Sequence, residues 1–171
     1  MKSCSFTGHR PEKIWDLKVG RITEEKVKAV IRETVIMLGQ DGVRTFYSGM
    51  ARGTDMWAAE VVIELQKTYH DIELIAVKPF PEQTDMSWPE QEKIKYQDLL
   101  SKCTEVKVIC PVYEKEAYKK RNQYLVDNCE VLVAVYDPRH SRSGTGQTVR
   151  MAEKAKRRIL RINPSEIDKQ E

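Results

Sequence analysis

Residues 47–55 bring together the residue types that are best suited to bind a ligand. They read Tyr-Ser-Gly-Met-Ala-Arg-Gly-Thr-Asp, between an apolar run and a helical pattern. The two glycines permit positive φ or the close approach of a ligand. The start of the next helix offers N–H groups and partial positive charge, and an arginine matches phosphate geometry. The stretch therefore predicts a phosphate site, with a plain strand-to-helix turn as the alternative. The candidate residues are Ser48, Gly49, Arg52, Gly53, Thr54 and Asp55, with Thr54 or Asp55 as the helix cap.

Two more loops show similar chemistry. Residues 7–11, Thr-Gly-His-Arg-Pro, follow the first apolar run and combine a glycine with two donor side chains. Residues 141–146, Ser-Arg-Ser-Gly-Thr-Gly, repeat the small residues, hydroxyls and helix start of the first stretch. Loops of this kind on one parallel sheet predict a phosphate held from two directions. Their candidate residues are Gly8, His9, Arg10, Ser143, Gly144 and Thr145.

Single residues elsewhere complete the candidate site. Asp137 ends the fifth apolar run, where it would accept a hydrogen bond from a ribose hydroxyl or a base. Arg121 and Asn122 lie in a helical pattern and matter only if that helix points at the site. Phe80 and Trp88 would stack on a base or simply pack under a loop.

Several familiar sites are not indicated. The glycines do not form G-x-G-x-x-G, the lysine of a Walker A loop is missing, and no H-E-x-x-H or EF-hand pattern occurs. The four cysteines form no C-x-x-C pair. We therefore expect reduced, mostly buried thiols and no metal site.

The bulk properties predict one α/β domain over residues 1–171, with a polar tail from about residue 163. The net charge of +3 permits an anionic ligand. The pI of about 8.6 is below the value of about 9 that is typical of nucleic-acid-binding domains. No apolar run is long enough to span a membrane, and the N-terminus lacks the apolar region of a signal peptide. These features predict a cytoplasmic protein.

Strand and helix patterns alternate along the chain. This alternation predicts a Rossmann-like, doubly wound, mainly parallel sheet of about six strands with helices on both faces. Ligands in such sheets bind outside the carboxyl ends of the strands, where the strand order reverses. Strands are expected at 2–7, 43–47, 72–77, 105–110, 131–136 and 159–162. Helices are expected at about 23–39, 56–65, 89–100, 114–128 and 147–157.

Taken together, these motifs resemble the SLOG superfamily and, within it, the YpsA/YoqJ-like branch. The resemblance covers nearly the whole chain. It rests on residues 7–11, 48–55, 79–88, 121–122 and 143–145. Residues 48–55 also resemble the S-G-x-A-x-G-I-D motif of DNA-processing protein A, with Thr54 in place of isoleucine. The resemblance implies a Rossmann-like fold that binds NAD, ADP-ribose or another nucleotide as a sensing module, and it makes a homodimer plausible by analogy.

Two other branches of the superfamily imply different functions. Relatives of DNA-processing protein A bind single-stranded DNA, but here Gln123 replaces the second arginine of their R-N-R motif. LOG-like phosphoribohydrolases carry P-G-G-x-G-T-x-x-E. The position of its glutamate falls on Thr148 or Arg150 here, neither of which is a carboxylate acid or base. Nucleotide hydrolysis would therefore need another carboxylate, such as Asp55 or Asp137.

Overall fold

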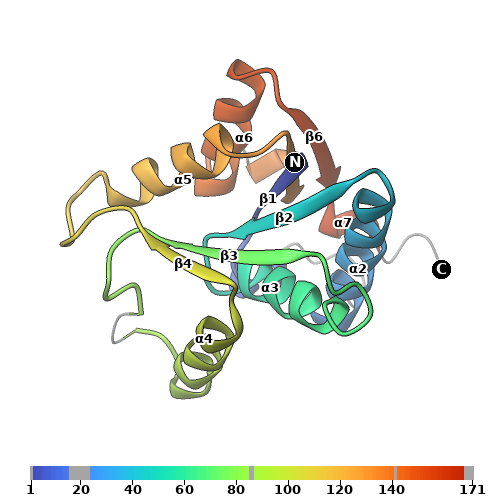
Figure 1. Ribbon diagram of the computed structural model, residues 1–171. Coiled ribbons are helices and arrows are strands. Elements are labelled where there is room, and N and C mark those ends of the chain that lie inside the picture. The colour runs from blue at the N-terminus through green and yellow to red at the C-terminus, as the bar shows by residue number, and fades with distance from the viewer. Residues whose placement is uncertain (1, 16–23, 85–86, 141, 168–171) are drawn as a thin grey trace.

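The computed structural model describes residues 2–15, 24–84, 87–140 and 142–167, and a six-stranded sheet forms its centre (Figure 1). All the pairings of these strands are parallel. The sheet has the order β4-β3-β2-β1-β5-β6. The strands are β1 (Lys2–Gly8), β2 (Val43–Ser48), β3 (Glu73–Lys78), β4 (Glu105–Val108), β5 (Val131–Val135) and β6 (Arg158–Ile162).

The order of the strands reverses beside β1. The chain adds β2, β3 and β4 on one side of β1 and then returns to place β5 on the other side. A crevice for a ligand is expected where this reversal occurs, at the carboxyl ends of β1 and β5. The predicted fold class is therefore confirmed.

Helices cover both faces of the sheet (Figure 1). Helices α5 and α6 pack on one face, and α2, α3, α4 and α7 lie on the other. The helices are α1 (Pro11–Trp15), α2 (Glu24–Gln40), α3 (Thr54–Leu65), α4 (Glu90–Lys102), α5 (Ala117–Asp127), α6 (Gly144–Lys154) and α7 (Pro164–Ile167), and a 3₁₀ turn spans Pro138–His140. No helix in these described parts of the chain combines the length and apolar character needed to cross a membrane.

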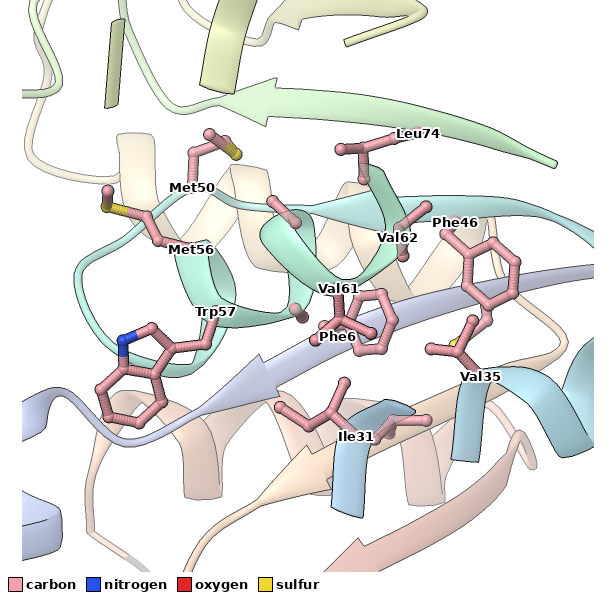
Figure 2. Packing of buried hydrophobic residues seen from close by; sticks show 14 of the residues in the cluster. Phe6, Ile31, Val35, Phe46, Met50, Met56, Trp57, Val61, Val62 and Leu74 are labelled. Atoms are coloured by element: carbon pink, nitrogen blue, oxygen red, sulfur yellow. The ribbon is translucent and has the colours of Figure 1, made fainter. Parts of the chain in front are cut away.

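The main core lies between the sheet and the layer of α2 and α3. Side chains alternate along a strand, so Val131, Val133 and Val135 of β5 face this core while Leu132 and Ala134 face α5 and α6. Figure 2 shows Phe6 and Phe46 from neighbouring strands packed against Ile31 and Val35 of α2 and Val61 of α3. The sequence spacing predicts one apolar stripe on α2 at Val27, Val30, Ile31, Val35 and Leu38. Four of these residues are buried, whereas Val30 is only half-buried.

Several boundaries differ from the predicted ones. The last long helix begins at Gly144, because the Ser143 side chain accepts a hydrogen bond from Gly146 N and caps it. Residues 144–146 are thus its first turn rather than a preceding loop. Neither Thr54 nor Asp55 caps α3, whose N-cap is Gly53. The expected polar tail contains the short helix α7, in which Pro164 and Ser165 are buried. Residues 16–23, which include the expected start of the first long helix at about residue 23, lie outside the described residues.

Candidate functional site

A cavity of about 390 Å³ opens at the switch point of the sheet. It lies at the end of β1, under one face of α5 and beside the first turn of α6. Ligand sites of α/β proteins occur at this position and are usually about 300 Å³ or larger. The lining residues are Thr7, Gly8, His9, Arg10, Lys13, Ala51, Asp55, Tyr118, Arg121, Asn122, Leu125, Ser143, Gly144, Thr145, Gln147 and Thr148.

Most of the predicted site residues meet in this cavity. The loop after β1, the pair on α5 and the start of α6 come from distant parts of the chain and line one space. Nine of the fifteen predicted residues contribute: Gly8, His9, Arg10, Asp55, Arg121, Asn122, Ser143, Gly144 and Thr145. The other six, Ser48, Gly49, Arg52, Gly53, Thr54 and Asp137, do not belong to the lining.

The lining is cationic. Among the described residues that form it, Arg10, Lys13 and Arg121 carry positive charge and Asp55 alone carries a carboxylate. Arg10 and Lys13 are exposed on the loop and helix after β1, whereas Arg121 is only 5% exposed. Three cations against one anion favour an anionic ligand.

Arg121 forms the floor of the cavity. Its Nη1 donates to the Gly49 carbonyl at 2.6 Å, and its Nε donates to Asn122 Oδ1 at 3.0 Å. Burial lowers the pKa of Arg121, while the neighbouring Asp55 partly opposes that effect. Because an arginine stays protonated even so, it brings a fixed positive charge to the floor.

Asp55 lies beside this arginine and is 6% exposed. Its Oδ2 accepts a hydrogen bond from Ala51 N at 3.3 Å. Burial raises the pKa of Asp55 to about 6, although Arg121, the Ala51 N–H and Arg10 each act to lower it. A perturbed carboxyl in a cavity of this kind is a frequent mark of a functional site.

The first turn of α6 forms the opposite wall. Ser143 caps the helix through the Gly146 N–H, at 3.1 Å. Thr148 lies one turn further on, and its hydroxyl donates to the Gly144 carbonyl at 3.1 Å. A Cβ on Gly144 would meet no atom within 4 Å, so the space beside this turn is open. A helix start of this form accommodates phosphate oxygens.

The loop after β2 supports the site more than it lines it. Gly53 has a φ of 84°, as predicted, but Met50, rather than Gly49, supplies the second positive φ, of 60°. Ser48 holds this turn, because its hydroxyl donates to the Asp55 carbonyl at 2.8 Å and accepts from Met50 N at 3.1 Å. Ser48 thus has a hydrogen-bonding role inside the turn, and its expected contact with a ligand stays a prediction.

The loops after β1 and β2 are packed tightly against each other. The Thr54 hydroxyl donates to the His9 carbonyl at 3.0 Å, and a Cβ on Gly53 would lie 2.8 Å from that carbonyl. A Cβ on Gly8 would collide with the Thr54 side chain. Gly8, Gly53 and Thr54 thus allow the close approach that brings His9 and Arg10 beside Asp55.

Arg52 points away from the cavity. Its Nη2 donates to Glu12 of α1 at 2.6 Å, and its Nε donates to Glu92 of α4. These two carboxylates raise the pKa of Arg52. Because both carboxylates already occupy the guanidinium, the expected phosphate contact at Arg52 is not favoured by this arrangement.

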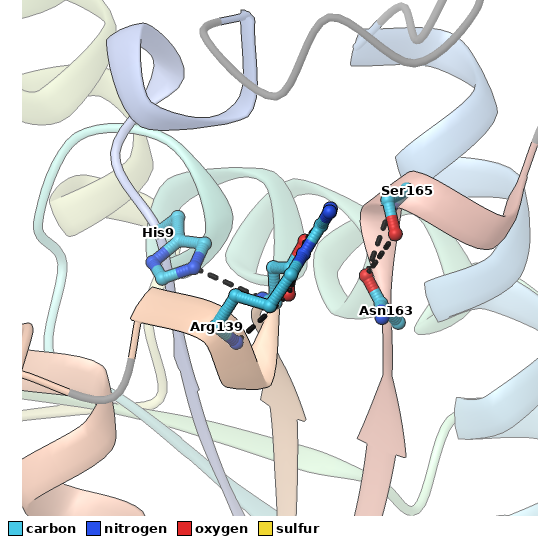
Figure 3. A network of polar contacts seen from close by, with 5 residues as sticks. His9, Arg139, Asn163 and Ser165 are labelled. Atoms are coloured by element: carbon cyan, nitrogen blue, oxygen red, sulfur yellow. Dashed lines mark hydrogen bonds and ion pairs between the residues drawn. The ribbon is translucent and has the colours of Figure 1, made fainter.

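Asp137 is also engaged elsewhere. Arg139 binds both of its carboxylate oxygens, and Asp137 N donates to His9 Nε2 at 3.0 Å. Figure 3 shows His9 and Arg139 in this network, near the separate Asn163–Ser165 pair. The expected ribose contact at Asp137 is therefore not favoured, whereas His9 is held with Nε2 as an acceptor.

Tyr118 lines the cavity but was not predicted to be a site residue. It lies three and four residues before Arg121 and Asn122, on the cavity face of α5. Its ring stands 5.7 Å from the Arg121 guanidinium carbon and meets Phe80 edge to face at 5.7 Å. Phe80 and Trp88 are buried and do not line the cavity, in agreement with the packing alternative. The spacing of residues on one face of a helix could have identified Tyr118, because Tyr118, Arg121 and Leu125 follow each other at intervals of three and four residues and all line the cavity.

The cysteines agree with the expectation of thiols. All four are unpaired, and Cys4, Cys110 and Cys129 are buried. Within the described ranges, no group of three or more His, Cys, Asp or Glu residues is arranged to hold a metal ion.

Solved structures with a similar fold include two DNA processing proteins A. The protein from Streptococcus pneumoniae aligns with a TM-score of 0.60 and 17% identity, over 94% of this chain and 50% of that one. The protein from Helicobacter pylori, solved for its single-stranded DNA binding mode, aligns with a TM-score of 0.61 and 18% identity, over 94% and 64%. The chain thus spans about half to two thirds of those proteins, and the likeness shows the Rossmann-like fold.

Closer relatives are found by sequence. A UPF0398 protein of Bacillus cereus is 32% identical over 139 residues, which cover 80% of this chain and 75% of that protein. A UPF0398 protein of Bacillus pumilus is 29% identical over 145 residues, 84% of this chain and 77% of that one. The model of the YpsA family, described as the YspA SLOG family, matches residues 4–168. The chain therefore belongs to the YpsA family of SLOG proteins.

Proposed function

We propose that this protein binds a nucleotide-derived ligand in the cavity at the switch point and acts as a cytoplasmic sensing protein. The main support is that three cationic side chains line the same cavity as the first turn of α6. These side chains are Arg10, Lys13 and Arg121. In this proposal the phosphate lies against Ser143–Thr145, where helix N–H groups and the positive charges favour an anion. NAD, ADP-ribose and AMP are the ligands to test.

A thermal-shift measurement with these three nucleotides tests the proposal. A ligand at 100 times its Kd stabilises the fold by about 2.7 kcal/mol, which raises Tm by roughly 5–10 °C in a domain of this size. The variant Arg10→Ala combined with Lys13→Ala should reduce the shift, since both side chains are exposed and line the cavity. Lys119→Ala is the matched control, an exposed cation of α5 outside the lining. The absence of a shift with all three nucleotides would refute the proposal.

A second candidate is single-stranded DNA binding. It is supported by the fold shared with DNA processing protein A and by the exposed cations Arg10 and Lys13 at the cavity rim. Binding of a labelled oligonucleotide, followed by anisotropy, should then weaken steeply as salt increases. No binding at low salt would exclude this candidate.

Nucleotide hydrolysis is the least supported of the three functions. Thr148, at one of the positions aligned with the LOG glutamate, lines the cavity with a hydroxyl, and Arg150 lies outside the lining. Chromatography of nucleotides incubated with the protein should show no release of free base.

A further inference from the structure

Asp55 is out of place in a site built for phosphate. It is the one carboxylate among the described residues of the lining, and it lies deep in the protein at 6% exposure. A buried carboxylate repels a phosphate group and is costly to ionise without partners. The carboxylate therefore indicates a different part of the ligand, one that brings hydrogen-bond donors without negative charge.

The hydrogen bonds of Asp55 leave room for such donors. In the described structure Oδ2 accepts one bond, from Ala51 N at 3.3 Å, and no donor is within bonding distance of Oδ1. No ion pair within 4 Å joins Asp55 to a described cation, although Arg121 and Arg10 are close enough to influence its pKa. An ionised carboxylate has about four acceptor positions, so most of them remain for a ligand.

The three parts of a nucleotide can be assigned to the cavity by their chemistry. The phosphate suits the first turn of α6, and the flat base suits Tyr118, the one tyrosine, phenylalanine or tryptophan in the described lining. The ribose joins phosphate to base, and its two neighbouring hydroxyls are neutral donors. They are the groups that match a carboxylate kept apart from the phosphate.

We propose that Asp55 accepts hydrogen bonds from the 2′- and 3′-hydroxyls of a ribonucleotide, so that the cavity selects ribonucleotides over 2′-deoxyribonucleotides. This inference rests on the proposed binding of a nucleotide. It names the class of that ligand and separates it from DNA, whose sugars lack the 2′-hydroxyl. Asp55 thereby takes the role that the sequence had suggested for Asp137.

The expected selectivity follows from desolvation. A deoxyribonucleotide would close the cavity over Asp55 and leave an acceptor oxygen without a donor. An unsatisfied buried polar group of this kind lowers affinity on the order of tenfold to a hundredfold. The variant Asp55→Asn presents one acceptor oxygen and no charge, so its discrimination between the two sugars should be much weaker.

Calorimetric titration at pH 7.5 with AMP, GMP, CMP and UMP and with their 2′-deoxy counterparts tests the inference. We expect the wild-type protein to bind the ribonucleotide at least about tenfold more tightly than its 2′-deoxy counterpart. In Asp55→Asn this ratio of affinities should fall below about threefold. Asp137→Asn is the matched control, a second buried aspartate outside the lining, and it should keep the ratio.

The outcomes separate the two levels of the proposal. Equal affinity of the wild-type protein for both sugars would overturn the role of Asp55 and leave nucleotide binding intact. The absence of binding by every nucleotide, including NAD and ADP-ribose, would overturn both. The wild-type ratio decides the question even if Asp55→Asn fails to fold.

Discussion

Arg121 and Asp55 both lie close against the backbone of Gly49, although no ion pair joins the two side chains. A Cβ placed on Gly49 would lie 2.6 Å from Arg121 Nη1 and 3.0 Å from Asp55 Oδ2. The missing side chain at this glycine is therefore what allows a buried cation and a buried carboxyl to share the floor of the cavity.

Gly49→Ala should displace the Arg121 side chain, which is fixed by its bond to the Gly49 carbonyl. We expect a loss of about 1–3 kcal/mol in the free energy of unfolding, as for other overpacked sites, and a weaker thermal shift with nucleotide. Denaturant unfolding measures the first effect. Gly39→Ala is the control, because its Cβ would meet no atom within 4 Å. Equal stability of Gly49→Ala and the wild-type protein would contradict the close contact.

Asp55→Asn should make the protein more stable at neutral pH. The pKa of Asp55 rises from 3.8 to about 6 in the folded state. A group with a raised folded pKa stabilises the fold at low pH, and this contribution is lost as pH rises through the folded value. The rise of about two pKa units corresponds to about 3 kcal/mol at pH 7.5.

We therefore expect Asp55→Asn to gain about 1–3 kcal/mol in the free energy of unfolding at pH 7.5 and clearly less at pH 4.5. Urea unfolding at the two pH values measures this difference. A variant that is less stable than the wild-type protein at pH 7.5 would show that the ionised carboxylate stabilises the fold. Higher stability together with lost sugar selectivity is the usual pattern for a residue retained for function.

Tyr118→Ala should weaken nucleotide binding by about 1–3 kcal/mol, the usual value of one base stacked on an aromatic ring. Tyr118→Phe keeps the ring and should bind within about threefold of the wild-type protein. Tyr113→Ala controls for general loss of aromatic surface, since Tyr113 contacts Phe80 but is 65% exposed outside the lining. Equal affinities for Tyr118→Ala and Tyr118→Phe would argue against stacking.

Arg52→Ala should affect stability more than binding. It removes the link between Glu12 of α1 and Glu92 of α4, at a cost of about 0.5–1 kcal/mol, because Glu12 is 60% exposed and Glu92 is 30% exposed. The thermal shift produced by a saturating nucleotide should stay close to that of the wild-type protein. A shift that disappears in Arg52→Ala would restore the phosphate role predicted for this residue.

The fold was largely predictable because β3 and β5 are short apolar runs and α2 shows one mostly buried stripe. The parallel order followed from their alternation. The start of α6 was placed three residues late, since the sequence pattern treated Gly144 and Gly146 as loop residues, whereas the Ser143 cap makes them the first turn.

The site was predictable only at the level of loops. Residue types alone selected Arg10, Asp55, Arg121 and Gly144 as candidates, and these four residues line the same cavity. They could not show that Arg52 is held by Glu12 and Glu92, because these partners lie 40 residues away in both directions of the chain. The pairing of Asp137 with Arg139 was equally hidden, since two residues of spacing allow that contact only in the turn that follows β5.

The return of the chain from β4 to β5 also sets when the site can form. Cys4 of β1 pairs with Val131 of β5, a separation of 131 − 4 = 127 residues. Strands this distant in sequence pair late in folding, because the entropic cost of closing a long loop must be overcome first. The wall contributed by α6 follows β5 in the chain, so it reaches the loop after β1 only once this pairing exists. During refolding, the capacity to bind ligand should therefore return after most of the helical signal, and it reports completion of the whole sheet.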